Sequence, residues 1–254
     1  MVLLSVLMTA TAAFGDDSGL FVSPENAAVR ARKSPEMLFV DIRSPADFEA
    51  ISIPGAVNIP LYAVKTKTFL KKKMMVLVNN GFCKRQLTES CRKLKAMDFD
   101  PRILNGGLNA WIEKDLPVRG TFFACKAVCR VSPREAFQEK FAQSFLPVNI
   151  SGKRQTKVFK RTRFLDPSES GSLSVLTRYN HSHRTGTILV FNRAGTGYSG
   201  LKKKLAAAGI ENVFFLKGGW RGYEAYLDGL DRCRAPKARR IKTVNKTGCK
   251  SCGD

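Results

Sequence analysis

The residues best suited to covalent chemistry in this 254-residue chain are its seven cysteines. Cys83 lies beside Lys84 and Arg85, and neighbouring cations favour the thiolate, so we expect a lowered pKa and a candidate nucleophile here. A half-buried structural thiol is the alternative. Cys249 and Cys252 form a C-x2-C pair, which can act as a redox dithiol, a sulfur relay or a disulfide. These two places are the candidates for thiol chemistry in the sequence.

Other residues with metal-binding or thiol chemistry fit that role less well. His181 and His183 have no cysteine or carboxylate at ligand spacing, so we expect exposed loop residues. Cys91 falls at helical spacing with Leu87 and Leu94, which favours a place in the core. We predict no metal site and no cofactor.

An internal repeat organises the elements that would position these side chains. Four segments recur in the same order at nearly constant offsets of 109, 108, 113 and 112 residues. They begin at Ser23 and Ser132, Leu38 and Leu146, Val76 and Leu189, and Gly106 and Gly218. The simplest account is two copies of one domain.

Each copy reads as alternating strand and helix. Short apolar runs predict buried strands at 37–42, 74–78 and 102–104, and again at 146–150, 187–191 and 213–216. Helical periodicity follows in the region of Leu87 and at 200–208. This alternation predicts an α/β fold with mostly parallel sheets and helices on both faces. Ligands of such sheets bind outside the carboxyl ends of the strands, so the loops after Val78 and Phe191 are the expected sites.

The composition of the chain sets the remaining boundaries. Residues 1–15 combine an apolar run with small residues, which predicts a signal peptide and a periplasmic or otherwise exported protein. The domains are expected at 20–120 and 131–230, with a linker at 121–130. Residues 231–254 form a basic tail that carries the C-x2-C pair. No stretch is long enough to predict a transmembrane span.

Three segments of the first copy resemble a known family. The runs 40–49 (VDIRSPADFE), 53–60 (IPGAVNIP) and 104–111 (LNGGLNAW) are similar to successive motifs of rhodanese domains. In the second copy only the Gly-Gly segment at 216–220 and the loop glycines near Ser199 fit, and the counterpart of 41–49 is mostly lost. The resemblance implies two tandem rhodanese-like domains, the second degenerate.

Active members of this family are sulfurtransferases, so the resemblance implies a persulfide-forming cysteine at the strand end before the loop. Asparagine stands there in both copies, at Asn79 or Asn80 and at Asn192. An amide cannot form a persulfide, although it can hydrogen-bond an anion. The remaining loop positions implied by the resemblance are Gly81, Lys84, Arg85, Arg193, Gly195 and Ser199. Asp41 and Arg43 carry over as a pair that supports the loop or as a structural ion pair.

The charge balance indicates the class of partner. The chain has 43 basic and 21 acidic residues and a net charge of +22, which favours anionic partners or a solvated basic surface. No nucleic-acid-binding motif is present, so we do not expect nucleic acid as the partner. The basic tail could contact an anionic surface.

These observations lead to two hypotheses. The first is a catalytically degenerate rhodanese-like protein of an oxidising compartment, which binds a small sulfur-containing anion or a partner-protein thiol. The alternative is a thiosulfate-type sulfurtransferase that uses Cys83 or a relay through Cys249 and Cys252.

Overall fold

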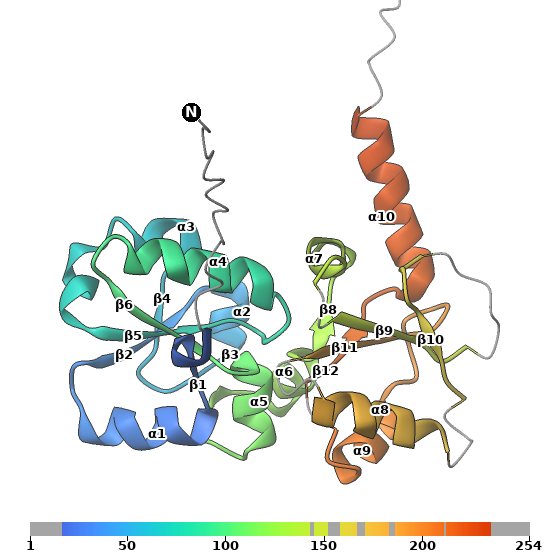
Figure 1. The fold of residues 1–254 in the computed structure, drawn as a ribbon, viewed down its shortest axis with the longest axis horizontal. Coiled ribbons are helices and arrows are strands. Elements are labelled where there is room, and N and C mark those ends of the chain that lie inside the picture. The colour runs from blue at the N-terminus through green and yellow to red at the C-terminus, as the bar shows by residue number, and fades with distance from the viewer. Residues whose placement is uncertain are drawn as a thin grey trace, which may run out of the picture.

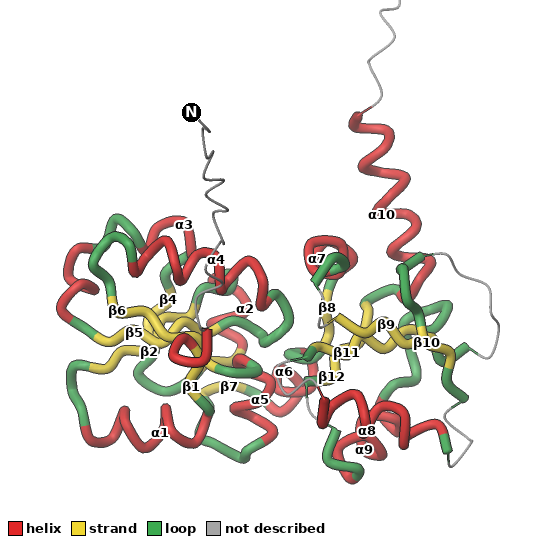
Figure 2. The backbone as a smooth tube through the Cα atoms, in the orientation of Figure 1, coloured by secondary structure: helices red, strands yellow, loops and turns green. Residues whose placement is uncertain are grey.

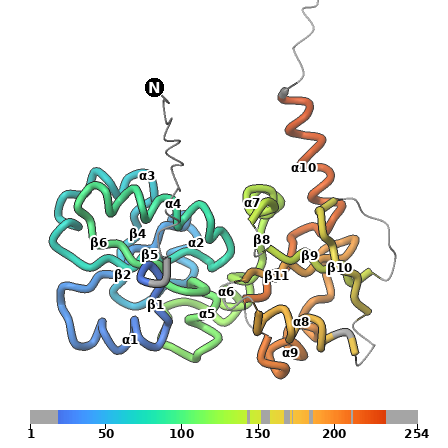
Figure 3. Tube along the Cα trace, viewed as in Figure 1, coloured from blue at the N-terminus to red at the C-terminus, as the bar shows by residue number. Residues whose placement is uncertain are grey.

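The computed structural model describes residues 17–142, 145–151, 158–166, 171–182, 186–210 and 212–234. These residues form two parallel five-stranded sheets, each flanked by helices, so the predicted α/β fold is confirmed (Figure 1, Figure 2). The chain completes the first sheet before it enters the second (Figure 3). Among the described residues, no helix has both the length and the apolar character needed to cross a membrane.

The first sheet has the strand order β1-β6-β5-β2-β4. Its strands are β1 (Phe21–Val22), β2 (Met37–Asp41), β4 (Val57–Asn58), β5 (Met74–Val78) and β6 (Asp100–Leu104). All its pairings are parallel, with Asp41 opposite Val78 at the carboxyl ends of β2 and β5. A short antiparallel ribbon, β3 (Ile51–Ser52) with β7 (Arg119–Gly120), lies beside this sheet.

The second sheet has the order β10-β9-β11-β12-β8. Its strands are β8 (Arg130–Val131), β9 (Phe145–Asn149), β10 (Arg163–Phe164), β11 (Thr187–Phe191) and β12 (Val213–Leu216). Numbered within each domain, both sheets run first, fifth, fourth, second and third strand. The two domains therefore share one strand order.

Helices cover both faces of each sheet (Figure 1). In the first domain these are α1 (Pro24–Lys33), α2 (Pro45–Ala50), α3 (Leu61–Val64), α4 (Lys84–Lys95) and α5 (Gly107–Glu113), with 3₁₀ turns η1 (Asp17–Leu20) and η2 (Thr68–Lys72). In the second they are α7 (Pro133–Glu139), α8 (Ser172–Ser182), α9 (Ser199–Ala207) and α10 (Gly219–Arg234). Strand β5 contributes side chains to the apolar cores on both faces of the first sheet. Met75 and Leu77 pack on the α4 side, and Val76 and Val78 pack on the α1 side.

The predicted strands and helices agree with the structure to within two residues at most ends. Helix α4 buries Leu87, Cys91 and Leu94 on one face, so the prediction of a core position for Cys91 is confirmed. Strong caps explain why several helices begin where they do. Ser132 makes a capping box with Glu135 at the start of α7, which fixes the orientation of that carboxylate.

The structure adds detail at two predicted boundaries. The segment 121–130, predicted as a linker, contains helix α6 (Phe122–Ala127), which a Thr121 cap begins, so the connection between the two sheets is partly helical. Helix α10 continues to Arg234, because Tyr223, Leu227 and Leu230 keep a partly buried stripe at helical spacing. The first four residues of the predicted tail, 231–234, are therefore helical. The predicted signal peptide and Cys249 and Cys252 lie outside the described residues.

Candidate functional site

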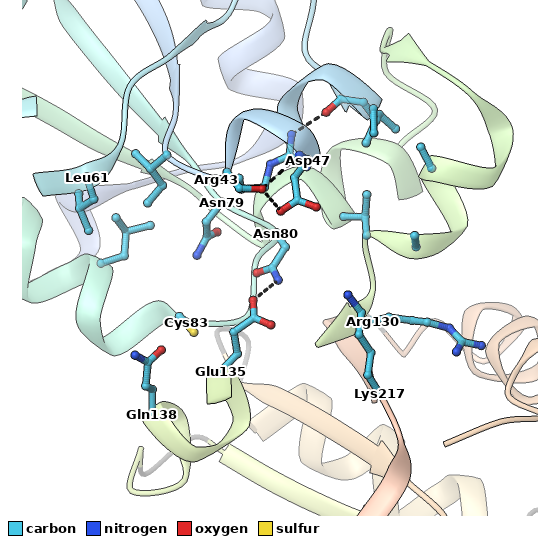
Figure 4. Close-up of a pocket in the computed structure, with 18 of the residues that line it drawn as sticks. Arg43, Asp47, Leu61, Asn79, Asn80, Cys83, Arg130, Glu135, Gln138 and Lys217 are labelled. Carbon is cyan, nitrogen blue, oxygen red and sulfur yellow. Dashed lines mark hydrogen bonds between the residues drawn. The ribbon is translucent and has the colours of Figure 1, made fainter. Parts of the chain in front are cut away.

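A pocket of about 350 Å³ lies between the two domains, at the carboxyl ends of β2 and β5 (Figure 4). The first domain contributes Arg43, Asp47 and the loop that follows β5, whereas the second contributes Glu135, Gln138 and Lys217. Figure 4 shows Lys217 directed into the pocket and the guanidinium of Arg130 directed away from it. The loop predicted as the site from the sequence therefore lines this pocket.

In the loop after β5, residues 79–83, two asparagine side chains accept hydrogen bonds from backbone N–H groups of the same loop. The Gly81 N–H donates to Asn79 Oδ1 at 2.8 Å, and the Phe82 N–H donates to Asn80 Oδ1 at 2.9 Å. A positive φ of 106° at Gly81 lets the loop turn, and a Cβ there would lie 2.1 Å from the carbonyl oxygen of Gly106. The Gly81 and Phe82 N–H groups, which could otherwise bind an anion, therefore already donate to the two asparagines.

Helix α7 of the second domain contacts the same loop and the start of α4 through hydrogen bonds to two carboxylates. Asn80 Nδ2 donates to Glu135 Oε1 at 3.0 Å, and the Arg85 N–H at the start of α4 donates to Glu139 Oε1 at 3.2 Å. Glu139 is only 3% exposed, and burial raises the pKa of its carboxyl group, against the opposing effect of nearby N–H donors and cations. A carboxylate of the chain itself therefore occupies the positive end of α4.

Phe82 joins the first domain's loop to the second domain's core. Its side chain is fully buried, and its ring packs edge-on against Phe214 at 5.3 Å and Phe145 at 6.1 Å. Both partners belong to strands of the second sheet. The loop is thus held between the domains by apolar packing as well as by hydrogen bonds.

Cys83 lies at the end of this loop and lines the pocket. The expectation of a lowered pKa is wrong, because burial, and then Glu135 and Glu139, raise the pKa of its thiol well above the ordinary value. Burial also lowers the pKa of Lys84, to about 8, and Lys84 is not among the groups that shift the pKa of the Cys83 thiol. The Arg85 guanidinium lies 3.8 Å from Glu89 and donates to the carbonyl oxygen of Gln138 at 3.4 Å. At neutral pH the Cys83 thiol is protonated, which disfavours nucleophilic attack.

Asp41 and Arg43 form a buried ion pair beside the pocket, with a shortest N–O distance of 2.6 Å. Arg43 also donates to the carbonyl oxygen of Ile51, and Asn58 Nδ2 donates to the carbonyl oxygens of both Asp41 and Arg43. The pair therefore ties the end of β2 to the segments that surround the pocket. This geometry fits both roles expected from the sequence, structural pairing and support of the site.

The corresponding loop of the second domain, residues 192–198, is closed within its own domain. Asn192 Oδ1 accepts from the Gly195 N–H at 2.6 Å, and its Nδ2 donates to the carbonyl oxygen of Thr196. Arg193 is exposed, and Ser199 is the first residue of α9. Tyr198 is 3% exposed and stacks on Phe215 at 4.8 Å, so this loop's aromatic residue packs into its own core.

The remaining candidates do not line the pocket. His181 is exposed as expected, but it lies in the last turn of helix α8 and not in a loop, and His183 lies outside the described residues. Cys125, Cys129 and Cys233 are free thiols. Within the described part of the chain, no group of three histidine, cysteine or acidic residues is placed to hold a metal ion. Sequence reasoning missed Glu135, Glu139 and Lys217, because residues of the second copy were not expected at the first copy's loop. The capping-box pattern at Ser132 was the one local signal that Glu135 is held in place.

Comparison with known proteins agrees with this architecture. Residues 25–114 match the family described as rhodanese-like domain, so this part of the chain is a rhodanese-like domain. The adenylyltransferase and sulfurtransferase MOCS3 of Drosophila virilis is 27% identical over 101 residues, which are 35% of this chain and 22% of that protein. The protein of the same description from Drosophila ananassae is 30% identical over 94 residues, 34% of this chain and 21% of that protein. This chain spans about a fifth of the length of these relatives.

Solved structures with a similar fold include two that differ in what they cover. A rhodanese-related protein from Thermoplasma volcanium has 19% identity and a TM-score of 0.34, and the match covers 39% of this chain and 95% of that one. The thiosulfate sulfurtransferase from Pseudomonas aeruginosa has 14% identity and a TM-score of 0.35, over 81% of this chain and 42% of that one. Identities this low carry no shared activity.

Proposed function

We propose that this protein is a catalytically degenerate tandem rhodanese-like protein that binds an anionic or thiol-bearing partner in the pocket between its domains. The observation that carries this proposal is Asn79. It stands where the family has its nucleophile, and its Oδ1 already accepts the Gly81 N–H that would support a thiolate. The matched strand order of the second sheet supports a second, degenerate rhodanese-like domain.

The pocket keeps features suited to binding. Lys217 supplies a cation from the second domain, and Asn79, Asn80 and Gln138 supply amide groups along the wall. Amides and ammonium groups recognise oxyanions without covalent chemistry. An exported, oxidising location belongs to the same proposal and is motivated by residues 1–15. Mass spectrometry of the mature N-terminus tests it, because cleavage near Asp16 is the expected result.

A second candidate function remains because Cys83 is the described cysteine that lines the pocket. In that case the protein is a sulfurtransferase with a relocated nucleophile, or it passes sulfur through Cys249 and Cys252. The raised pKa of the Cys83 thiol counts against the first route. A second domain that moves away from the loop would remove Glu135 and Glu139 and restore a reactive thiol.

The deciding experiment is thiosulfate:cyanide sulfurtransferase turnover of the full chain, with mass spectrometry for persulfide. The proposal expects no turnover and no sulfur gain. Turnover that disappears in Cys83→Ser but persists in Cys233→Ser, the matched exposed thiol, would establish the second candidate instead. Loss in a Cys249→Ser/Cys252→Ser variant would assign the relay.

Binding is measured separately with thiosulfate as the probe, by isothermal titration calorimetry. Lys217→Ala should weaken binding by about tenfold, the usual effect of removing one charged hydrogen bond. Lys203→Ala changes an exposed lysine of α9 and should leave binding unchanged. Equal affinity in wild type and Lys217→Ala would contradict a pocket site for the anion.

A further inference from the structure

Helix α6 exposes two consecutive phenylalanines. Phe122 is 67% exposed and Phe123 is 81% exposed, and their rings form an edge-on pair with centroids 6.2 Å apart. Single exposed apolar residues are ordinary, but two adjacent aromatic rings form a contiguous apolar projection. The opposite side of the helix is anchored, because Ala124 and Cys125 pack against the first domain's core. The aromatic pair is therefore a rigidly supported part of the surface.

Basic residues surround this projection. Lys126 Nζ lies 4.1 Å from the centre of the Phe122 ring, and Arg119 and Arg130 are exposed before and after the helix. The sequence from Pro117 to Arg134 contains no aspartate or glutamate. With a net charge of +22 over the chain, the surface that complements this region is anionic.

The shape of the region narrows the choice of partner. Phe122 and Phe123 project outward and do not line a groove, so the partner must receive them. A lipid headgroup layer accepts aromatic side chains without a preformed pocket, while its phosphates pair with lysine and arginine. A second copy of this chain would bring the same basic residues together and be repelled.

We infer that α6 docks onto the surface of an anionic lipid bilayer, with Phe122 and Phe123 in the headgroup layer and Arg119 and Lys126 at the phosphates. This contact lies within the described residues and is distinct from the basic tail considered from the sequence. It does not depend on which ligand the pocket takes. Because Ala124 and Ala127 of the same helix line that pocket, docking would hold the pocket close to the bilayer.

The test is co-sedimentation of the full chain with vesicles of phosphatidylcholine, alone or with about a third phosphatidylserine. Wild type should bind the anionic vesicles and leave the neutral ones largely unbound. Phe122→Ser/Phe123→Ser should weaken binding by at least about tenfold, since two aromatic side chains no longer leave water. Lys126→Glu should weaken it several-fold. Phe141→Ser, which changes a phenylalanine that is 69% exposed outside α6, should have no effect.

The three variants are first compared with wild type by near-ultraviolet circular dichroism and thermal unfolding, so that a loss of binding is not a loss of fold. The inference is overturned if the wild-type protein does not bind anionic vesicles, or if it binds neutral vesicles equally well. It is also overturned if the double phenylalanine variant binds like wild type, because the contact would then lie elsewhere in the chain. Capture of an acidic protein by wild type with no vesicle binding would assign α6 to a protein partner instead.

Discussion

The loop after β5 and the loop after β11 occupy equivalent places in their sheets, and they are closed by the same device at their start. An asparagine side chain accepts the N–H of a positive-φ glycine, Asn79 with Gly81 in one and Asn192 with Gly195 in the other. Asparagine therefore has a structural role in both loops, as the residue that completes the turn.

The two loops differ in where their aromatic residue goes. Phe82 leaves its own domain and packs between Phe145 and Phe214, whereas Tyr198 turns inward onto Phe215 of its own sheet. One loop consequently couples the domains and the other does not. The ends of the neighbouring strands differ as well. Asp41 pairs with the Arg43 guanidinium, while Asn149 Oδ1 accepts from the backbone N–H and the hydroxyl of Ser151.

The largest effect is expected for Phe82→Ala, which should destabilise the protein by about 4 kcal/mol and split one unfolding transition into two. The reason is that loss of the Phe82 ring leaves a cavity at the contact that couples the two domains. Each domain has one tryptophan, Trp111 in the first and Trp220 in the second. Changing one of them to Phe leaves a single fluorophore, whose fluorescence in urea follows the unfolding of one domain. Tyr198→Ala should cost a similar amount while the two transitions stay coincident. Coincident transitions in Phe82→Ala would remove the distinction between the loops.

The strand-end comparison predicts a smaller effect for Asp41→Asn, about 3 kcal/mol, because the buried Arg43 guanidinium loses its counter-charge. Adding Arg43→Ser recreates the arrangement found at Asn149 and Ser151, so the double variant should recover most of that loss. Urea unfolding of the two single variants and the double variant completes the cycle. A double variant no more stable than Asp41→Asn would show that the two strand ends are not interchangeable.

Burial of Lys84, the residue after the first loop, predicts a dependence of stability on pH. Its pKa falls from 10.5 to about 8 in the folded protein, so the unfolded chain binds this proton more tightly. The stability that the neutral amine contributes is present above pH 10.5 and is lost as the pH falls through about 8. This contribution of Lys84 to the unfolding free energy should drop by about 3 kcal/mol as the pH falls over this range.

Lys84→Met should flatten that slope, whereas Lys93→Met, an exposed lysine on the same helix, should keep it. The difference between these slopes gives the contribution of Lys84 alone, because the cysteines and tyrosines that titrate in the same pH range are present in both variants. Identical slopes in wild type and Lys84→Met would mean that the Lys84 ammonium is solvated.

The smallest stability effects concern the carboxylates of α7. Glu139→Ala and Glu135→Ala should each cost about 1 to 2 kcal/mol, since each removes an acceptor from a loop donor. Both should speed iodoacetamide labelling of Cys83, measured by peptide mass spectrometry, because these carboxylates raise the pKa of its thiol. Glu89→Ala, an exposed residue on α4, is the matched control. If labelling is unchanged in both variants, the carboxylates of α7 do not control the reactivity of the Cys83 thiol.

The elements of the fold could be predicted from the sequence, because each signal is local. Apolar runs such as Met74–Val78 gave buried strands, and the stripe of Leu87, Cys91 and Leu94 gave the buried face of α4. The position of Asn79 at a strand end also follows from the run before it. Local patterns of this kind depend on residues only a few positions apart.

The chemistry of Cys83 could not be predicted in this way. Its sequence neighbours Lys84 and Arg85 indicated a thiolate, yet one is itself desolvated and the other points to Glu89. The groups that act on the thiol, Glu135 and Glu139, lie more than fifty positions further along the chain and meet it only when the domains pack. Electrostatics at an interface depends on tertiary structure, which a single sequence does not display.

The insertion of Phe82 has a consequence for synthesis of the protein. A ribosome delivers the whole first domain before Phe145 and Phe214 exist, so for that interval a large apolar side chain has no core to enter. The nascent first domain therefore exposes the Phe82 ring to water until the second domain is made. A fragment that ends near residue 120 keeps this exposed side chain permanently, and for that reason we expect it to be less soluble than the full chain.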